Sequence, residues 1–190
     1  MSKMCKLDAD KTAVVLGCGM EGLLTVAALK TLGINKIIVI DKESEKSRAM
    51  EFGAWEFIGS HGKNGVAGVK DKIRAAGDMA DAVFICTDSP MGRNVARRFM
   101  KNSGSICEMG FLCGWRRTPT ARYFEDSMPA GGRFYAARDY ENCMNFLAKA
   151  AEMKLPLYKL ITHRYKLEEI NEAMWTVVRE EGLGIAVFNR

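Results

Sequence analysis

The sequence predicts an α/β fold in which a mostly parallel, doubly wound sheet is covered by helices on both faces. Short, continuously apolar runs rich in β-branched residues are typical of strands buried on both sides, and they recur through the chain. Segments with apolar residues at helical spacing separate these runs. Parallel strands need such crossover connections, which are almost always right-handed. The alternation therefore predicts one sheet with helices packed on each side.

The predicted elements follow one another in the same order through most of the chain. The strands are expected at 12–16, 36–40, 56–58, 82–86, 105–109, 133–136 and 185–188. The helices are expected at 20–32, 43–52, 69–76, 90–101, 142–153 and 167–179. Gly33 and Gly53 stand where left-handed helix caps belong, and Pro90 suits a first helical turn. Two stretches, 61–68 and 110–132, lack periodicity and are expected to be loops.

Composition bounds the class of protein. A chain of 190 residues with 48% hydrophobic and 27% charged residues is expected to fold around one well-buried core. No apolar run reaches the length of a membrane span, and no hydrophobic signal core follows the first lysines, so we expect a cytoplasmic protein without membrane contact. The six cysteines form no Cys-x-x-Cys pair, which favours buried free thiols over a disulfide framework.

The basic residues are scattered along the chain. A formal net charge of +5 is mild, and no basic stripe interleaved with aromatic residues is visible. We therefore expect no nucleic-acid partner, and we interpret the charge as a solvated surface with some attraction for a phosphorylated ligand.

Glycines at 17, 19 and 22 carry the clearest functional signal. Their G-x-G-x-x-G spacing lies between the first predicted strand and the first predicted helix. In that setting the first glycine allows the tight turn, the second leaves room for a pyrophosphate and the third lets helix and strand pack closely. The anion would bind the unpaired N–H groups at the positive end of the helix dipole. This is the phosphate-binding turn of a Rossmann-type fold.

Asp41 strengthens this interpretation. It ends the second predicted strand, nineteen residues after Gly22. A carboxylate there would accept hydrogen bonds from the adenosine ribose and repel the extra phosphate of NADP, so NAD is favoured over NADP. The structural alternative is that the glycines only shape a turn and that Asp41 only caps the helix that follows.

Four stretches of the sequence resemble the cofactor domain of medium-chain, zinc-type alcohol dehydrogenases. They are Val14–Leu24, Ile38–Asp41, Glu51–Ala54 and Leu160–Ala173. The resemblance implies a six-stranded sheet of order 3-2-1-4-5-6, NAD(H) at its carboxyl edge and a homodimer built through the sixth strands. It also implies three segments: a residual linker at 1–11, an NAD(P)-binding Rossmann domain at 12–155, and a C-terminal segment at 156–190 that resembles the return into the catalytic domain.

The resemblance implies roles for individual residues. Asp41 and Lys46 match contacts to the adenosine ribose, Met109 and Phe111 match backbone contacts to the nicotinamide amide, and Phe134 falls nearby. The cofactor-binding residues that we expect are Gly17, Gly19, Met20, Glu21, Gly22, Asp41, Lys42, Lys46, Thr87, Met109, Phe111 and Phe134.

The sequence also departs from the family. The catalytic domain, which would supply the zinc ligands, is expected to precede residue 1, so we expect neither catalytic nor metal-binding residues in this chain and zinc only in that other domain. The two histidines, His61 and His163, have no cysteine or acidic residue at ligand spacing and are interpreted as structural or surface residues. Asp88 replaces a frequent glycine and Gly184 a basic residue of some relatives, which predicts weaker cofactor binding.

Three functional hypotheses remain open from the sequence. The leading one is the NAD(H)-binding domain of a zinc-type alcohol or polyol dehydrogenase, inactive as this chain alone. The second is a subunit of a split dehydrogenase, or a non-catalytic NAD-binding module. The remote third is an S-adenosylmethionine-dependent methyltransferase, which normally carries an acidic residue just before the glycines, where this chain has Val15 and Leu16.

Overall fold

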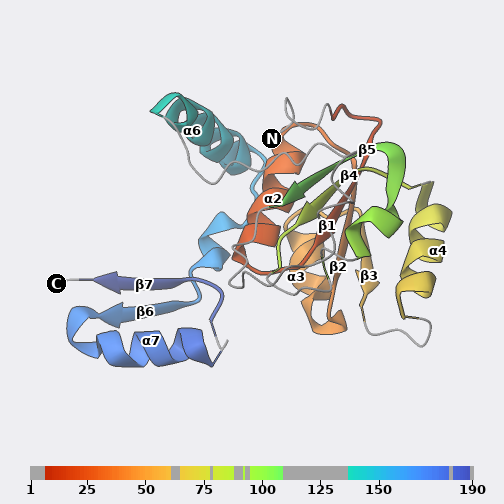
Figure 1. The fold of residues 1–190 in the computed structure, drawn as a ribbon. Coiled ribbons are helices and arrows are strands. Elements are labelled where there is room, and N and C mark those ends of the chain that lie inside the picture. Colours follow the sequence, from red (N-terminus) through yellow and green to blue (C-terminus); the bar gives the residue numbers. More distant parts are fainter. Residues whose placement is uncertain are drawn as a thin grey trace. The chain divides into compact units, whose positions relative to one another are not determined.

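A computed structural model of the chain describes residues 7–60, 65–77, 79–87, 92, 95–108, 137–179 and 182–188. The chain divides into two compact units, Met1–Leu155 and Pro156–Arg190. Figure 1 shows a sheet with helices in the first unit and a smaller assembly of two strands and a helix in the second. Each unit is described by itself.

The sheet of the first unit has five parallel strands in the order β3-β2-β1-β4-β5. They are β1 (Thr12–Leu16), β2 (Lys36–Asp41), β3 (Glu56–Gly59), β4 (Ala80–Ile85) and β5 (Met100–Glu108) (Figure 1). The predicted α/β class and the first five places of the strand order are confirmed. The prediction of a six-stranded sheet is wrong for the described part of the chain, where this sheet ends with β5. The strand predicted at 133–136 lies outside the described residues.

Helices cover both faces of this sheet. They are α2 (Met20–Thr31), the 3-10 turn η1 (Glu43–Glu45), α3 (Lys46–Glu51), α4 (Gly65–Gly77) and the 3-10 turn η2 (Arg97–Phe99). The first unit also contains α6 (Ala137–Glu152), which contacts α2. In Figure 1, α2 and α3 lie on one side of the strands and α4 lies on the other. Gly33 and Gly53 have φ angles of +84° and +105°, so they adopt the left-handed conformation predicted after the first two helices.

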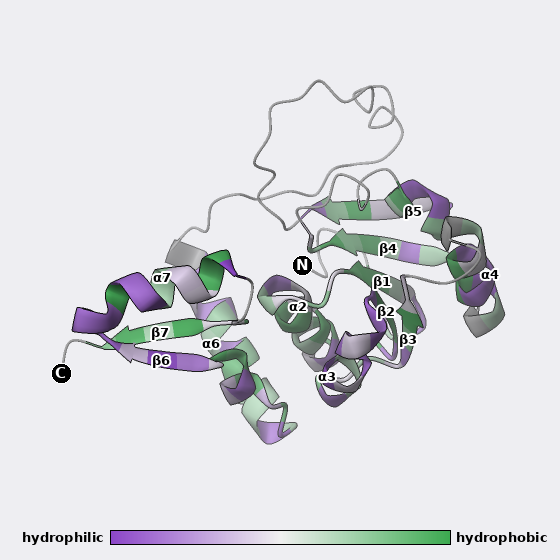
Figure 2. Cartoon of the chain, turned by 90° about the horizontal axis from the view of Figure 1, so that it is seen from below, coloured by the Kyte–Doolittle hydropathy of each residue, from purple (hydrophilic) through white to green (hydrophobic). Residues whose placement is uncertain are grey.

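The core follows from the uninterrupted apolar runs of the strands. All five residues of β1 are buried, as a central strand covered on both faces requires. On one face, Val14 and Ile38 pack with Val69 and Ile73 of α4 and with Phe99 of η2. Figure 2 shows β1, β2 and β4 as largely hydrophobic strands. This packing fixes the strand ends at which the glycine turn lies.

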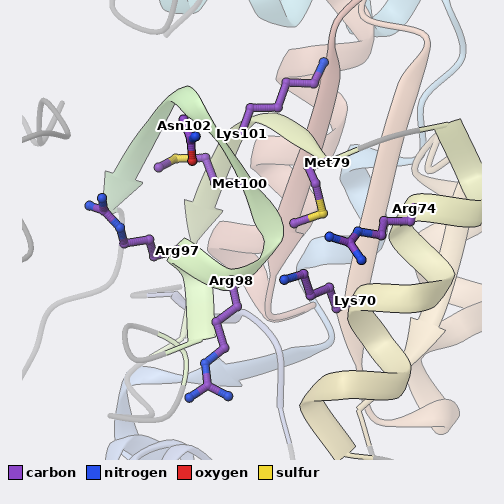
Figure 3. A pocket seen from close by; sticks show the side chains of 8 residues that line it. All are labelled: Lys70, Arg74, Met79, Arg97, Arg98, Met100, Lys101 and Asn102. Atoms are coloured by element: carbon purple, nitrogen blue, oxygen red, sulfur yellow. The ribbon is translucent and has the colours of Figure 1, made fainter.

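The connection between β4 and β5 differs from the prediction. A helix was expected to extend to about Lys101, but β5 begins at Met100. The pairing passes from Ala80↔Met100 to Ala82↔Ser105, so β5 carries three extra residues as a bulge. The polar, glycine-containing sequence of 101–104 gives no strand signal of its own, and the strand forms there through its pairing with β4. Beside this bulge, α4, η2 and the amino ends of β4 and β5 line a pocket (Figure 3).

The second unit is a two-stranded parallel sheet with a helix. It contains η4 (Leu157–Leu160), β6 (His163–Lys166), η5 (Leu167–Glu169), α7 (Ile170–Val178) and β7 (Ile185–Phe188). Strand β7 was predicted, but it pairs with β6 rather than with the large sheet. The Thr162 hydroxyl ties the unit together, because it accepts the Leu183 N–H at 2.9 Å and donates to the Gly184 carbonyl at 3.2 Å.

The cysteines divide into two groups. Cys18, Cys86 and Cys143 are free, as expected, and the first two are buried. The expectation of free thiols is wrong for Cys107, which is disulfide-bonded. None of the described helices is both long enough and apolar enough to cross a membrane.

Candidate functional site

The turn from β1 into α2 is held by contacts that only glycine allows. Gly17 has a φ angle of +102°, and a Cβ atom there would overlap the backbone carbonyl of Cys86 at the end of β4. A Cβ atom on Gly22 would overlap the backbone carbonyl of Gly17. The Gly17 N–H also donates to the Ile40 carbonyl at 3.0 Å. The first and third glycines therefore let the turn, the helix and the neighbouring strands approach one another closely.

Gly19 is different, because none of the described residues fills the space beside it. No heavy atom of these residues lies within 4 Å of the position that a Cβ atom there would take, and its φ angle of −69° is one that any residue adopts. Gly19 caps α2 without a side chain, and the first intrahelical bond runs from the Leu23 N–H to the Gly19 carbonyl at 3.0 Å. The N–H groups of the first turn thus have no acceptor within the helix. An anion at this helix end fits both the open space and the positive end of the dipole.

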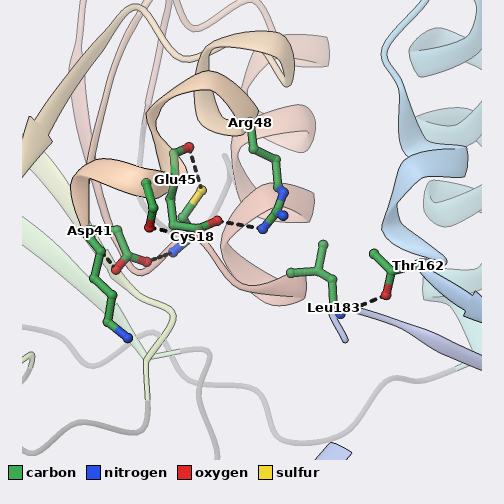
Figure 4. Close-up of polar contacts among 8 residues, drawn as sticks. Cys18, Asp41, Glu45, Arg48, Thr162 and Leu183 are labelled. Carbon is green, nitrogen blue, oxygen red and sulfur yellow. Dashed lines mark hydrogen bonds and ion pairs between the residues drawn. The ribbon is translucent and has the colours of Figure 1, made fainter. Parts of the chain in front are cut away.

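Asp41 joins the end of β2 to the glycine turn. Its Oδ2 accepts the Cys18 N–H at 2.6 Å and its Oδ1 accepts the Lys42 N–H at 2.6 Å (Figure 4). An ionised carboxylate has about four acceptor positions, so these two bonds leave capacity for hydroxyl groups of a ligand. The Asp41 carbonyl also accepts the Ser60 N–H at 2.7 Å, which holds β2 against the end of β3. Asp41 is thereby fixed beside the turn.

Acidic and basic side chains alternate just beyond Asp41. Glu43 and Glu45 belong to the short helix η1. Lys46 lies 3.8 Å from Glu43. Arg48 donates to Glu45 at 2.6 Å (Figure 4). The side chain of Lys46 is 56% exposed and can turn towards a ligand. Because Glu43 and Glu45 each face a base, the Asp41 carboxylate is the group that would repel an additional phosphate on the adenosine ribose.

Glu21 places a negative charge in the first turn of α2, beside Gly19. Its backbone carbonyl accepts the Thr25 hydroxyl at 2.7 Å, which keeps this turn helical. A carboxylate near a helix N-terminus is favourable for the helix, but it would compete with a bound phosphate for the same positive field.

We expect Glu21→Gln to tighten binding of NADH about threefold. The estimate corresponds to removing a like charge worth about 0.7 kcal/mol at an exposed helix end. Titration calorimetry at low salt measures the change, with Glu51→Gln, an exposed carboxylate of α3, as the matched control. Unchanged or weaker binding in Glu21→Gln would contradict this view of the site.

Two buried thiols, Cys18 and Cys86, lie behind the turn, and no sequence motif points to them. The Cys18 thiol lies 3.9 Å from the Glu45 carbonyl, and the Cys86 thiol lies 3.5 Å from the Thr25 hydroxyl. Burial raises the pKa of Cys86 to about 12, and burial together with the nearby carboxylates of Asp41 and Glu45 raises the pKa of Cys18 to about 12. Both stay protonated at neutral pH and act as packing groups.

These pKa values predict a loss of stability at alkaline pH. An unfolded chain ionises Cys86 near its ordinary pKa of 9.0, whereas the folded chain resists ionisation up to about 12. The contribution of this thiol is therefore complete below pH 9 and is lost as the pH rises towards 12. Between pH 8 and pH 10 we expect the free energy of unfolding to fall by about 1.4 kcal/mol more in the wild-type chain than in Cys86→Ala. Urea unfolding at both pH values checks this, and parallel pH curves would contradict it.

The remaining predicted residues fall into two groups. Thr87 lies two residues after the end of β4, and its Cβ lies 3.3 Å from the position that a Cβ on Gly17 would take, so the structure brings it to the turn. Met109, Phe111 and Phe134 lie outside the described residues. Cys86 lies beside the glycine turn because the strand order places β4 next to β1.

Residues 22–149 match the family model described as zinc-binding dehydrogenase. The chain belongs to the zinc-binding dehydrogenase family. Sorbitol dehydrogenase 1 of Saccharomyces cerevisiae is 29% identical over 180 residues, a match that covers 90% of this chain and 49% of the yeast protein. The chain thus spans about half the length of the curated relatives that it matches.

Solved structures of alcohol dehydrogenases share the fold of this family member. An alcohol dehydrogenase of Thermotoga maritima has a TM-score of 0.82 and 22% identity, over 95% of this chain and 50% of that one. A short chain alcohol dehydrogenase of Escherichia coli CFT073, solved with NADH, has a TM-score of 0.76 and 18% identity, over 98% of this chain and 55% of that one.

The zinc of the family name has no ligand cluster among the residues described here. In that part of the chain, no group of three or more His, Cys, Asp and Glu side chains is placed to hold a metal ion. His163 lies on β6, where its Nδ1 is 2.9 Å from the Thr162 hydroxyl and its ring stacks on Tyr165 with centroids 6.3 Å apart. These contacts support the structural interpretation of His163. His61 lies outside the described residues.

Proposed function

We propose that this chain is the NAD(H)-binding part of a zinc-type medium-chain dehydrogenase that acts on an alcohol or polyol. The observation that carries the proposal is the position at Gly19, which no described residue fills, next to the amino end of α2 and to Asp41. A dinucleotide pyrophosphate fits this position because a helix N-terminus attracts anions and none of the described side chains fills the space. The names of the relatives, sorbitol and alcohol dehydrogenases, support the proposed substrate class.

The residues with proposed roles lie along the carboxyl ends of the strands. The backbone of Gly17 to Gly22 would hold the pyrophosphate, with Met20 and Glu21 contributing N–H groups. Asp41 would accept the ribose hydroxyls, with Lys42 and Lys46 beside it, and Thr87, Met109, Phe111 and Phe134 would line the nicotinamide end. Bound NAD would supply the hydride acceptor, while zinc and the substrate contacts would belong to the part of the relatives' length that the matched residues do not span.

Titration calorimetry with NADH, NADPH and S-adenosylmethionine tests the proposal. We expect NADH to bind and NADPH to bind at least about tenfold more weakly, because the 2′-phosphate of NADPH would meet the carboxylate of Asp41. Asp41→Asn should reduce the ratio between the affinities for NADH and NADPH. Preferential binding of S-adenosylmethionine would favour the methyltransferase hypothesis, and binding of none of the three would defeat the proposal.

A second candidate is a subunit of a split dehydrogenase. The second unit exposes apolar side chains on α7, and Met174, Trp175, Val177 and Val178 are each more than half exposed. Exposed apolar groups of this density are typical of a surface that another polypeptide covers. Co-purification of a zinc-containing partner with this chain would favour this candidate, whereas a homodimer in solution would favour the pairing of two copies.

A further inference from the structure

A second charged region lies at the opposite edge of the first unit's sheet from the glycine turn. A pocket of about 380 Å³ there is lined by Lys70, Arg74, Met79, Arg97, Arg98, Met100, Lys101 and Asn102 (Figure 3). Met79 precedes β4, and Arg97 precedes β5, so the pocket lies at the amino ends of these strands. The glycine turn and Asp41 lie at carboxyl ends. Ligands at the two edges would therefore not exclude one another.

Positive charge is concentrated at this pocket. Five of its eight lining residues are Lys or Arg, out of 28 in the chain. The other 23 Lys and Arg residues are matched by 23 Asp and Glu residues, so the pocket carries as much positive charge as the whole chain's net +5. A pocket with this balance raises the local concentration of anions.

Nearby carboxylates offset only part of this charge. Asp81 accepts hydrogen bonds from Lys101 at 3.2 Å, and Lys11 lies 3.9 Å from the same carboxylate. Asp71 follows Lys70 on α4, but consecutive helical residues do not share a face. Lys70 and Arg74, four residues apart, do share one. Among the described residues, no acidic side chain forms an ion pair with Lys70, Arg74 or Arg98, so these three positive charges of the pocket remain.

The β5 bulge gives the pocket its shape. Lys101 and Asn102 belong to the extra residues of the bulge, which directs them away from the regular ladder. Met100 forms a buried part of the lining, because it packs against Gly104, where a Cβ atom would overlap its side chain. The pocket thus combines an apolar floor with a cationic rim.

The cationic groups do not converge on one point. Figure 3 shows Lys70 and Arg74 reaching from α4 towards Met79, whereas Arg97, Arg98 and Lys101 extend away from these two and away from one another. A ligand that contacts more than one of these side chains needs at least two anionic groups some distance apart. None of the lining residues is aromatic, so the pocket lacks the stacking platform that single-stranded nucleic acid requires. Its volume suits a small ligand.

We propose that this amino-edge pocket binds a small molecule that carries two or more phosphate groups, separately from the dinucleotide. Inorganic tripolyphosphate is a suitable probe, since it has the charge and no base or sugar. The test is calorimetric titration of the full chain at low ionic strength. Arg74→Gln/Arg98→Gln removes two exposed charges at the pocket, and Lys149→Gln/Arg164→Gln removes two exposed charges elsewhere as the matched control. Gly19→Val shows whether tripolyphosphate binds at the glycine turn instead of at the pocket.

We expect the pocket variant to bind tripolyphosphate at least about tenfold more weakly than the wild-type chain. The control variant should change binding less than twofold, and Gly19→Val should leave a binding event of wild-type affinity. Orthophosphate should bind more weakly than tripolyphosphate. The proposal is overturned by equal weakening in the two double variants, by loss of all binding in Gly19→Val, or by no heat with the wild-type chain. Tighter binding of a short single-stranded oligonucleotide at the same arginines would also overturn it.

Discussion

Gly19→Val is expected to abolish NADH binding while leaving the chain folded. Among the described residues, no heavy atom lies within 4 Å of the position of a Cβ atom on Gly19, so we expect the valine side chain to be accommodated without displacing protein atoms. The same methyl groups would occupy the position that the pyrophosphate needs. We expect at least about a 100-fold loss of affinity, which corresponds to about 2.7 kcal/mol. Replacing a glycine N-cap by valine should cost about 1 kcal/mol of stability.

Calorimetry for binding and circular dichroism for thermal unfolding separate these two effects. Gly19→Ala is the graded control, because a single methyl group intrudes less and should weaken binding less than valine does. If Gly19→Val binds NADH like the wild-type chain, the pyrophosphate does not lie at this turn. If the variant unfolds, the space at Gly19 is not open in solution.

Gly22→Ala is expected to show the opposite pattern, with a large loss of stability. Its Cβ atom would overlap the backbone carbonyl of Gly17, and a backbone atom cannot turn aside as a flexible side chain can. Forcing α2 away from β1 would disturb the best-buried part of the core. We expect a loss of about 3 kcal/mol, at the upper end for overpacking. For a chain of this size that lowers Tm by roughly 6–12 °C.

The matched control for Gly22→Ala is Gly19→Ala, the same substitution three residues earlier. It should lower Tm by only about 2–4 °C, the cost of losing a glycine N-cap, since no described protein atom lies within 4 Å of its Cβ position. Thermal unfolding followed by circular dichroism measures both variants. A wild-type Tm for Gly22→Ala would mean that helix and strand do not pack as closely as the structure shows.

Local patterns predicted the parts of the fold that local sequence determines. The predicted strand Thr12–Leu16 has the observed bounds, and Gly33 adopts the predicted left-handed conformation, because a continuous apolar run and a cap glycine each act over a few residues. Helices α4 and α6 begin at Gly65 and Ala137, four and five residues before the predicted starts. The start of α4 was missed because its first turn contains glycines, and the start of α6 was missed because the sequence there has no clear helix-start signal.

Features that depend on distant residues escaped prediction. Strand β6, with the sequence His163–Lys166, contains no apolar run, and it is ordered by pairing with β7 some twenty residues later. The bulge in β5 likewise depends on β4. At the site, spacing identified Asp41, but the bond from its carboxylate to the Cys18 N–H requires the loop geometry. The roles of the cofactor-binding residues stay predictions that the experiments above test.

The central claim is that NADH binds the backbone at the β1–α2 turn. The most direct measurement is a titration of the ¹⁵N-labelled chain with NADH, followed through the amide resonances of Gly17 to Gly22, with the Asp41 and Lys42 amides as a second reporter. We predict that these resonances shift first and most, with saturation at one equivalent. The account would be contradicted if the amide resonances of Gly17 to Gly22 did not shift while resonances elsewhere in the chain shifted to saturation.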